Sequence, residues 1–293
     1  MNFAGASAVM AGPVAEPAVS PERPVRTGLS LKTRIASALV LVPFVLAAIY
    51  AGGWVFLALL VIVAWILSGE WARVMAPDNP RFFTLATAGA VTAALILTLF
   101  GFVVPAIVVL LAGAVTVGVM AWGGKQKARW LAMGVLYIGC ALVASEWIRE
   151  AMAPPDGRNI IYWLLFVIWA TDTGALAAGA WLGGPKLAPD ISPRKTWSGA
   201  VGGMIAAMIV AGIATPWLFH VPMQAGLFLG AGASVIGQVG DLLESGIKRR
   251  FGIKDFGTVI PGHGGAFDRL DSLLLLMPFA AGGSVILMGA DLW

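Results

Sequence analysis

Nine stretches of nearly continuous apolar residues, separated by short polar segments, fill the chain from Ile35 to Ala290. Each has about the length at which an α-helix crosses a hydrocarbon core of roughly 30 Å. The pattern therefore predicts an all-α fold, a polytopic bundle of about nine transmembrane helices. The predicted spans are residues 35–51, 54–73, 82–100, 103–122, 130–149, 160–182, 198–219, 225–247 and 270–289.

The composition excludes the other classes. A soluble protein needs polar surface to cover its core, but 59% of these residues are hydrophobic and only 12% are charged. A transmembrane β-barrel requires apolar and polar residues to alternate, whereas the stretches here are continuous. An integral membrane protein is the class that remains.

The basic residues are distributed unevenly between the predicted loops. If the N-terminus lies in the cytoplasm, every one of the 19 lysines and arginines except Arg149 and Arg158 falls on the cytoplasmic side. Because cytoplasmic loops accumulate Lys and Arg, this bias predicts the orientation. The net charge of +4 then reflects topology and not nucleic-acid binding. We expect a protein of the cytoplasmic (inner) membrane, with its active site facing the cytoplasm.

The two halves of the chain differ in polarity. The second half carries Asp172 inside a span, and it places small residues four apart, as at Gly199 and Gly203 or Gly226 and Gly230, where helices can approach closely. We therefore expect a mainly structural first half and a catalytic second half. The expected parts are a disordered cytoplasmic tail (1–30), N-terminal transmembrane helices (31–150) and a catalytic region (151–293) with cytoplasmic loops 183–197 and 248–269.

The end of the eighth span carries a polar stripe. Asp241, Glu244, Ser245 and Lys248 fall at i, i+3, i+4 and i+7, on one face of a helix. An interfacial set of salt bridges would account for this pattern. Two carboxylates within one helical turn also repel each other, and a hard divalent cation would relieve that repulsion.

The loop that follows adds a second acidic pair. Glycine-rich backbone around His263 leads to Asp268, Arg269 and Asp271, where the last span begins. Exposed N–H groups at a helix start suit a phosphate. Taken alone, His263 fits a hydrogen-bonded loop residue better than a ligand. Acidic pairs at two neighbouring helix ends, with basic residues between them, favour a site for phosphate and Mg²⁺.

Two further elements are candidates for the site. Ser192 before Pro193 predicts a helix start, with Lys195 and Thr196 in its first turn, where a cation suits a bound anion. A positive-inside loop without further function is the alternative. Asp172 lies inside an apolar span, where an unpaired carboxylate is costly. A hydrogen bond to another helix through a neighbouring threonine would be its structural explanation.

Three segments resemble phosphatidate cytidylyltransferases, also called CDP-diacylglycerol synthases. The run SGIKRRFGIKDFGTVIPGHGGAFDRLD (245–271) resembles the hallmark of that family, and SPRKTWSG (192–199) and WATDTGA (169–175) resemble two of its other segments. Two positions depart from the family pattern. Ser198 stands where Glu is common, so we leave it out of the site, and Ala266 stands where a larger apolar residue is usual.

The resemblance implies a reaction in phospholipid biosynthesis, in which CTP and phosphatidic acid give CDP-diacylglycerol and pyrophosphate with Mg²⁺, and a second cation is left open. It implies catalytic roles for Asp172, Lys195, Asp241, Lys248 and Asp268, of which Asp241 and Asp268 are the expected metal ligands. The substrate-binding residues that it implies are Ser192, Thr196, Glu244, Ser245, Arg249, Lys254, Asp255, His263, Arg269 and Asp271.

Other functions stay open at this point. A lipid-alcohol kinase or an archaeal-type CDP-lipid synthase would also need cytidine and metal sites, but neither is expected to match the long segment so fully. A secondary transporter could use Asp172 and Asp241 to carry a coupling ion, although the charges gather at one membrane face. The expected partners are CTP, phosphatidic acid and membrane lipids but no nucleic acid, and a homodimer is left open.

Overall fold

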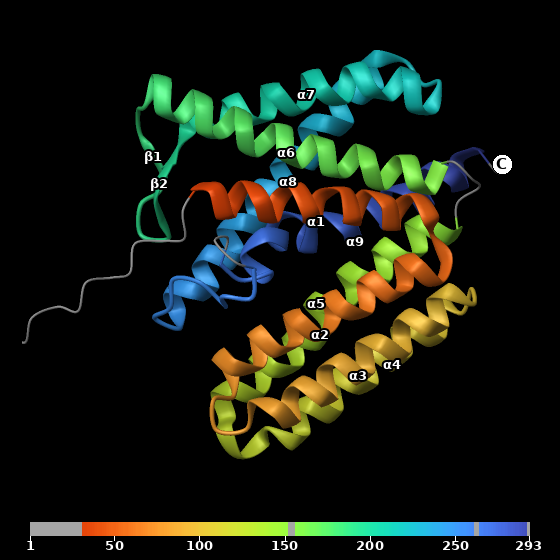
Figure 1. Ribbon diagram of the computed structural model, residues 1–293, viewed down its shortest axis with the longest axis vertical. Coiled ribbons are helices and arrows are strands. Elements are labelled where there is room, and N and C mark those ends of the chain that lie inside the picture. The colour runs from red at the N-terminus through yellow and green to blue at the C-terminus, as the bar shows by residue number, and fades with distance from the viewer. Residues whose placement is uncertain (1–30, 152–155, 261–263, 292–293) are drawn as a thin grey trace, which may run out of the picture.

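The computed structural model describes residues 31–151, 156–260 and 264–291, which form helices, one short hairpin and the segments that connect them (Figure 1). The predicted tail (1–30) and His263 lie outside the described residues. The elements are α1 (Leu31–Ala51), α2 (Gly53–Met75), α3 (Pro80–Leu99), α4 (Val103–Met120), the 3₁₀ turn η1 (Trp122–Gly124), α5 (Lys125–Ala151), α6 (Asp156–Leu182), β1 (Lys186–Ala188), β2 (Ser192–Thr196), α7 (Trp197–Phe219), α8 (Met223–Arg250) and α9 (Phe267–Asp291).

Seven of these helices, α2 to α8, are long and apolar enough to cross a membrane. The prediction of an all-α polytopic membrane protein is therefore confirmed at this level. The apolar part of α1 that is described, Ser37–Ala51, is shorter than a full crossing. The count of nine spans and the cytoplasmic N-terminus stay predictions.

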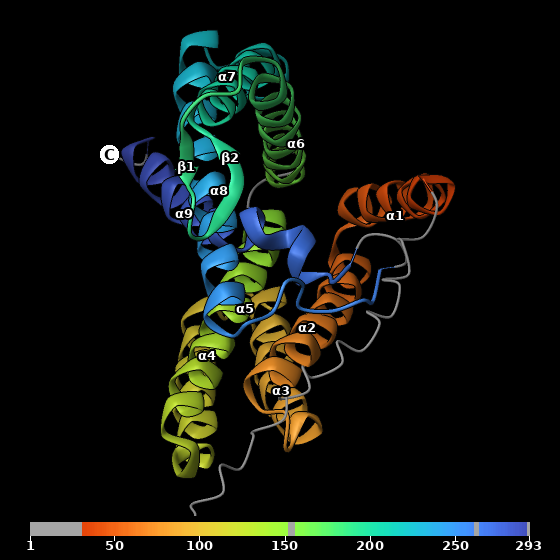
Figure 2. The same ribbon diagram turned by 90° about the vertical axis from the view of Figure 1, so that its left-hand side faces the viewer.

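The helices form two groups that α5 and α9 connect. Helices α2 to α5 pack on one another in the lower half of Figure 1, and α6, α7 and α8 pack on one another above them. Helix α9 contacts both α5 and α8, so it links the two groups. Figure 2 shows the β1–β2 hairpin beside α7 and α8, at one end of the upper group.

Small residues account for the close packing of the upper group. An added Cβ at Gly203 of α7 would lie 2.7 Å from the carbonyl oxygen of Thr171 on α6. One at Gly226 of α8 would lie 2.6 Å from the carbonyl oxygen of Ala211 on α7. Both distances are shorter than a Cβ contact allows, so these helices pack backbone against backbone, as the spacing of small residues predicted.

The predicted helix start at Ser192 is wrong. Ser192 begins strand β2, which pairs antiparallel with β1, and α7 begins only at Trp197. The N-cap is Thr196, whose hydroxyl accepts a hydrogen bond from the N–H of Gly199 at 3.1 Å. A Ser-Pro pair fits a helix start and an edge strand equally well, because both positions spare the missing N–H of Pro193. Pairing with β1, which lies before it in the chain, decides between them.

Candidate functional site

Three carboxylates converge where α8 approaches α9. Asp241, Glu244 and Asp271 each place one oxygen within 4.8 Å of the others. Glu244 is fully buried, whereas Asp241 and Asp271 are partly accessible. The helices can come this close because position 240 is glycine, where an added Cβ would lie 2.8 Å from the carbonyl oxygen of Asp271. Such a set of hard oxygen donors suits a divalent cation such as Mg²⁺.

Asp241 is also held by groups outside this set. The ammonium of Lys195, from β2, lies 2.5 Å from its Oδ2, and the hydroxyl of Ser245 donates to its Oδ1 at 3.4 Å. The Lys195 and Asp241 side chains are 26% and 31% exposed, so water and small ions reach the pair. The hairpin thereby brings a cation to a carboxylate of the cluster.

Lys248 links this cluster to the start of α9. Its ammonium lies 2.6 Å from Glu244 and 2.9 Å from Asp268. The second oxygen of Asp268 accepts hydrogen bonds at 3.1 Å from the N–H groups of Phe256 and Gly265. Both Asp268 oxygens therefore have partners within the protein, and they fix the loop before α9.

The structure thus separates the two residues that the resemblance paired as metal ligands. Asp241 belongs to the group of converging carboxylates, but among the described residues its neighbours there are Glu244 and Asp271, not Asp268. The role of Asp268 as a ligand stays a prediction. Asp271, expected only to bind substrate, is the carboxylate of α9 that the geometry places beside Asp241.

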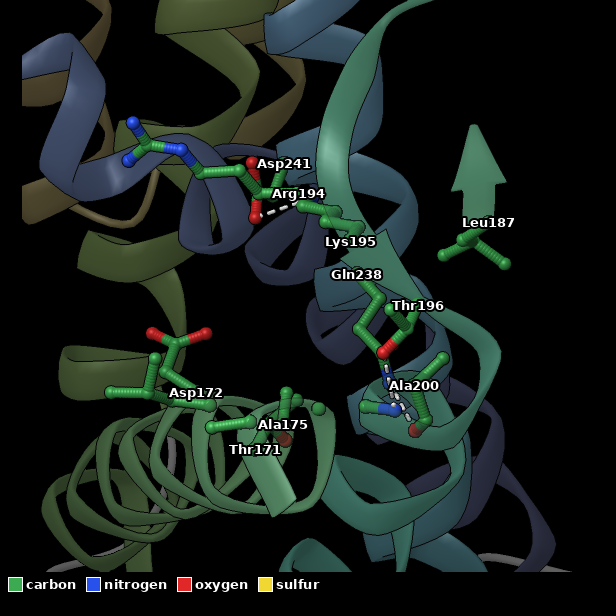
Figure 3. Close-up of a pocket in the computed structure, with 14 residues that line it drawn as sticks. Thr171, Asp172, Ala175, Leu187, Arg194, Lys195, Thr196, Ala200, Gln238 and Asp241 are labelled. Atoms are coloured by element: carbon green, nitrogen blue, oxygen red, sulfur yellow. Dashed lines mark hydrogen bonds and ion pairs between the residues drawn. The ribbon is translucent and has the colours of Figure 1, made fainter. Parts of the chain in front are cut away.

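A pocket of about 390 Å³ lies next to this cluster, between α6, α7, α8 and the hairpin. Asp172, Lys195, Thr196 and Asp241 line it, so four predicted site residues meet in one cavity. Figure 3 shows Asp172 rising from α6 into the pocket, with Lys195 joined to Asp241 at its far side. The hydroxyl of Thr171 bonds within its own helix, to the carbonyl of Val167 at 2.9 Å, and does not link α6 to another helix.

The other predicted residues that the structure describes are not among those that line the pocket. Arg249 donates from Nε to the carbonyl of Ile191 at 3.1 Å and so holds the turn of the hairpin. Ser198, which we left out of the site, donates to the carbonyl of Gly183 and closes the other end of the hairpin. Two of these residues, Ser192 and Ser245, are largely shielded from solvent. Four others are exposed: Arg249, Lys254, Asp255 and Arg269.

Sequence reasoning missed three residues. Arg194 and Gln238 line the pocket, and Gln238 donates to the carbonyl of Ala200 at 3.2 Å, which ties α8 to α7. Glu70, on α2, binds the backbone at the start of α9. A carboxylate and an amide within apolar spans were the available signals for Glu70 and Gln238, but the sequence does not tell which distant backbone such a side chain meets.

The model of the cytidylyltransferase family matches residues 32–285, which include every described residue of the site. The chain belongs to the cytidylyltransferase family. Its members in this comparison include proteins named phosphatidate cytidylyltransferase from Brucella suis and Brucella melitensis, each 36% identical over 267 residues, which cover 89% of this chain and 94% of theirs.

A relative from another genus matches over a shorter stretch. The phosphatidate cytidylyltransferase of Staphylococcus haemolyticus is 41% identical over 150 residues, which cover 50% of this chain and 55% of the relative. Membership in a cytidylyltransferase family requires that the site hold a triphosphate and its acceptor. The pocket beside the carboxylates, with Lys195 at its wall, is a candidate for that site.

Proposed function

We propose that this protein is a phosphatidate cytidylyltransferase, which transfers the cytidylyl group of CTP to phosphatidic acid. An oxygen of the phosphatidate phosphate bonds to the α-phosphorus of CTP, and the bond from that phosphorus to the α,β-bridging oxygen breaks. CDP-diacylglycerol and pyrophosphate result. The observation that carries the proposal is the pocket in which Lys195 and Asp241 meet, within a chain that matches its family almost from end to end.

The site must bring two anions together. The phosphate of phosphatidate is already ionised at neutral pH, so charge neutralisation and alignment matter more than a general base. Lys195 and Arg194 are among the residues that line the pocket, and the ammonium of Lys195 lies beside Asp241, where an entering phosphate would meet it. Lys248 is largely buried between Glu244 and Asp268, and its role on this proposal is to hold Asp268 and the loop in place.

The carboxylate cluster fits Mg²⁺. Its donors are all carboxylate oxygens, one from each side chain lies within 4.8 Å of the others, and two of the three residues are partly accessible. Asp241 and Asp271 would hold the ion, with Glu244 behind them. Bound Mg²⁺ would neutralise the charge of the triphosphate. Lys195 compensates Asp241 and lies at the pocket wall, where it is within reach of a phosphate.

The lipid enters, on this proposal, from the side of α6. That wall of the pocket is formed by Ala175, Leu176, Gly179 and Ala180. Leu176 is 75% exposed, so the apolar wall continues onto the outer surface of a helix that can span the membrane. An acyl chain can lie along this surface while its phosphate reaches Lys195. The homodimer, the choice of membrane and the cytoplasmic orientation of the site stay predictions.

A direct assay tests the function. Purified protein in detergent micelles is given CTP, phosphatidic acid and Mg²⁺, and both products are quantified. We expect CDP-diacylglycerol and pyrophosphate in equal amounts. Release of CDP with a phosphorylated lipid would instead identify a lipid kinase, and ion flux in liposomes without nucleotide would favour a transporter.

A further inference from the structure

Glu70 is a fully buried carboxylate on α2, in the half of the chain that we expected to be mainly structural. Its Oε1 accepts a hydrogen bond from the N–H of Ala266 at 3.0 Å, and its Oε2 accepts one from the N–H of Phe267 at 2.8 Å. Ala266 is the residue just before α9 and Phe267 is its first residue, and they lie 196 and 197 positions after Glu70 in the chain.

The start of α9 needs such a partner from elsewhere. The first N–H groups of a helix have no acceptor within the helix, and the residue just before the helix usually caps them with an oxygen-bearing side chain. In this chain that residue is Ala266, and Gly264 and Gly265 precede it. None of the three carries a side-chain acceptor. A carboxylate from another helix supplies one, and it also suits the positive end of the helix dipole.

The backbone of the loop that joins α8 to α9, here called the signature loop, leaves room for this carboxylate. An added Cβ at Gly257 would lie 2.3 Å from the Oε1 of Glu70, and one at Gly265 would lie 2.9 Å from the same oxygen. The neighbouring Trp71 stacks on Phe267 and Phe256, with ring centroids 5.3 and 5.7 Å away. One turn of α2 therefore holds the middle of the loop, at Phe256 and Gly257, and the start of α9, at Phe267.

We propose that Glu70 is a positioning residue for the transfer reaction, because it fixes the start of α9 and so the carboxylates that α9 carries. Asp268 follows Phe267 directly, and Asp271 lies about one helical turn further on. A shift or rotation at the helix start moves both, and displacements near 1 Å at a reacting centre cost up to roughly 100-fold in rate. This inference rests on the proposed cytidylyltransferase function.

The test compares Glu70→Gln with Glu146→Gln. Gln keeps the size of the side chain but turns a donor toward one of the two N–H groups. Glu146, on α5, is the matched control, since it is also fully buried and its oxygens accept no hydrogen bond from the described residues. Both variants are purified in detergent, and two quantities are measured: backbone amide hydrogen exchange in residues 264–270, and kcat and KM for CTP.

For Glu70→Gln we expect exchange in this segment to be about tenfold faster, since charge-assisted hydrogen bonds at its amides are weakened. We expect kcat to fall roughly 10- to 100-fold while KM for CTP changes less than threefold, because the displaced groups act on the reacting atoms. Glu146→Gln should change neither quantity by more than about twofold. If Glu70→Gln does not fold, Glu70→Asp replaces it, with a charge retained but a shorter reach, and the same two measurements apply.

Unchanged exchange in residues 264–270 overturns the anchoring. A kcat for Glu70→Gln within about twofold of the control overturns the positioning role, even if exchange is faster. Wild-type protein that makes no CDP-diacylglycerol refutes the proposed function instead, and the exchange measurement still decides whether Glu70 anchors α9.

Discussion

Asp241→Asn and Asp268→Asn each remove one negative charge, but in surroundings that differ. The Asp241 side chain is 31% exposed and pairs with Lys195, which is itself 26% exposed. The Asp268 side chain is only 6% exposed, and it accepts from the ammonium of Lys248 and from two backbone N–H groups. The two substitutions should therefore separate a role in cation binding from a role in holding the loop.

The surroundings of the two aspartates set the expected changes in stability. A partly exposed ion pair contributes at most about 1 kcal/mol, and Asn at position 241 also relieves repulsion within the carboxylate cluster. We expect the free energy of unfolding of Asp241→Asn to stay within about 1 kcal/mol of wild type. Asp268→Asn loses a buried charge-assisted hydrogen bond, which is worth about 1.5–3 kcal/mol. At roughly 2–4 °C per kcal/mol, its melting temperature should fall by roughly 3–12 °C.

Thermal melts in detergent, with and without Mg²⁺, measure both effects. An ion present at 100 times its Kd stabilises the folded protein by about 2.7 kcal/mol. We expect this gain in wild type and in Asp268→Asn but not in Asp241→Asn. Turnover should fall about 1,000-fold in Asp241→Asn, which corresponds to the loss of roughly 4 kcal/mol of transition-state stabilisation.

Asp271→Asn completes the comparison. If Asp271 is the second ligand, this variant also loses the stabilisation by Mg²⁺. If Asp268→Asn loses that stabilisation while Asp271→Asn keeps it, Asp268 and not Asp271 is the second ligand, and the assignment from the carboxylate cluster is refuted.

Three further predictions concern the supports of the site. Lys248→Met leaves the two buried carboxylates that it contacts without a counter-charge, and we expect about 3–5 kcal/mol of destabilisation, measured by thermal or denaturant unfolding. Gly240→Ala forces α8 away from α9, so it should lower the free energy of unfolding by about 1–3 kcal/mol and also reduce turnover. The control is Gly232→Ala, whose added Cβ meets nothing within 4 Å and which should be neutral or slightly stabilising. Equal effects of the two substitutions would contradict the close approach of α8 to α9. Thr196→Val removes the cap of α7 and should lower the unfolding free energy by about 1 kcal/mol, while Thr196→Ser should restore it.

Local periodicity was enough to predict what lies within one helix. Apolar runs of membrane length predicted the helices, because a helix that meets lipid must be apolar along its length. The spacing of Asp241, Glu244 and Lys248 predicted that they share one face of a helix. In the structure Lys248 pairs with Glu244, and Asp241 lies beside Glu244 in the carboxylate cluster. The resemblance added the family, which the comparison confirms.

Contacts between elements were decided only by the tertiary structure. Pairing with β1 makes Ser192 part of a strand, although its sequence fits a helix start. The close approach of α8 to α9 puts Asp271, not Asp268, beside Asp241. Packing of α2 on the signature loop gives Glu70 its partners. Sequence spacing fixes directions within a helix, but the side chains that meet across helices depend on how the helices pack, and that depends on the whole chain.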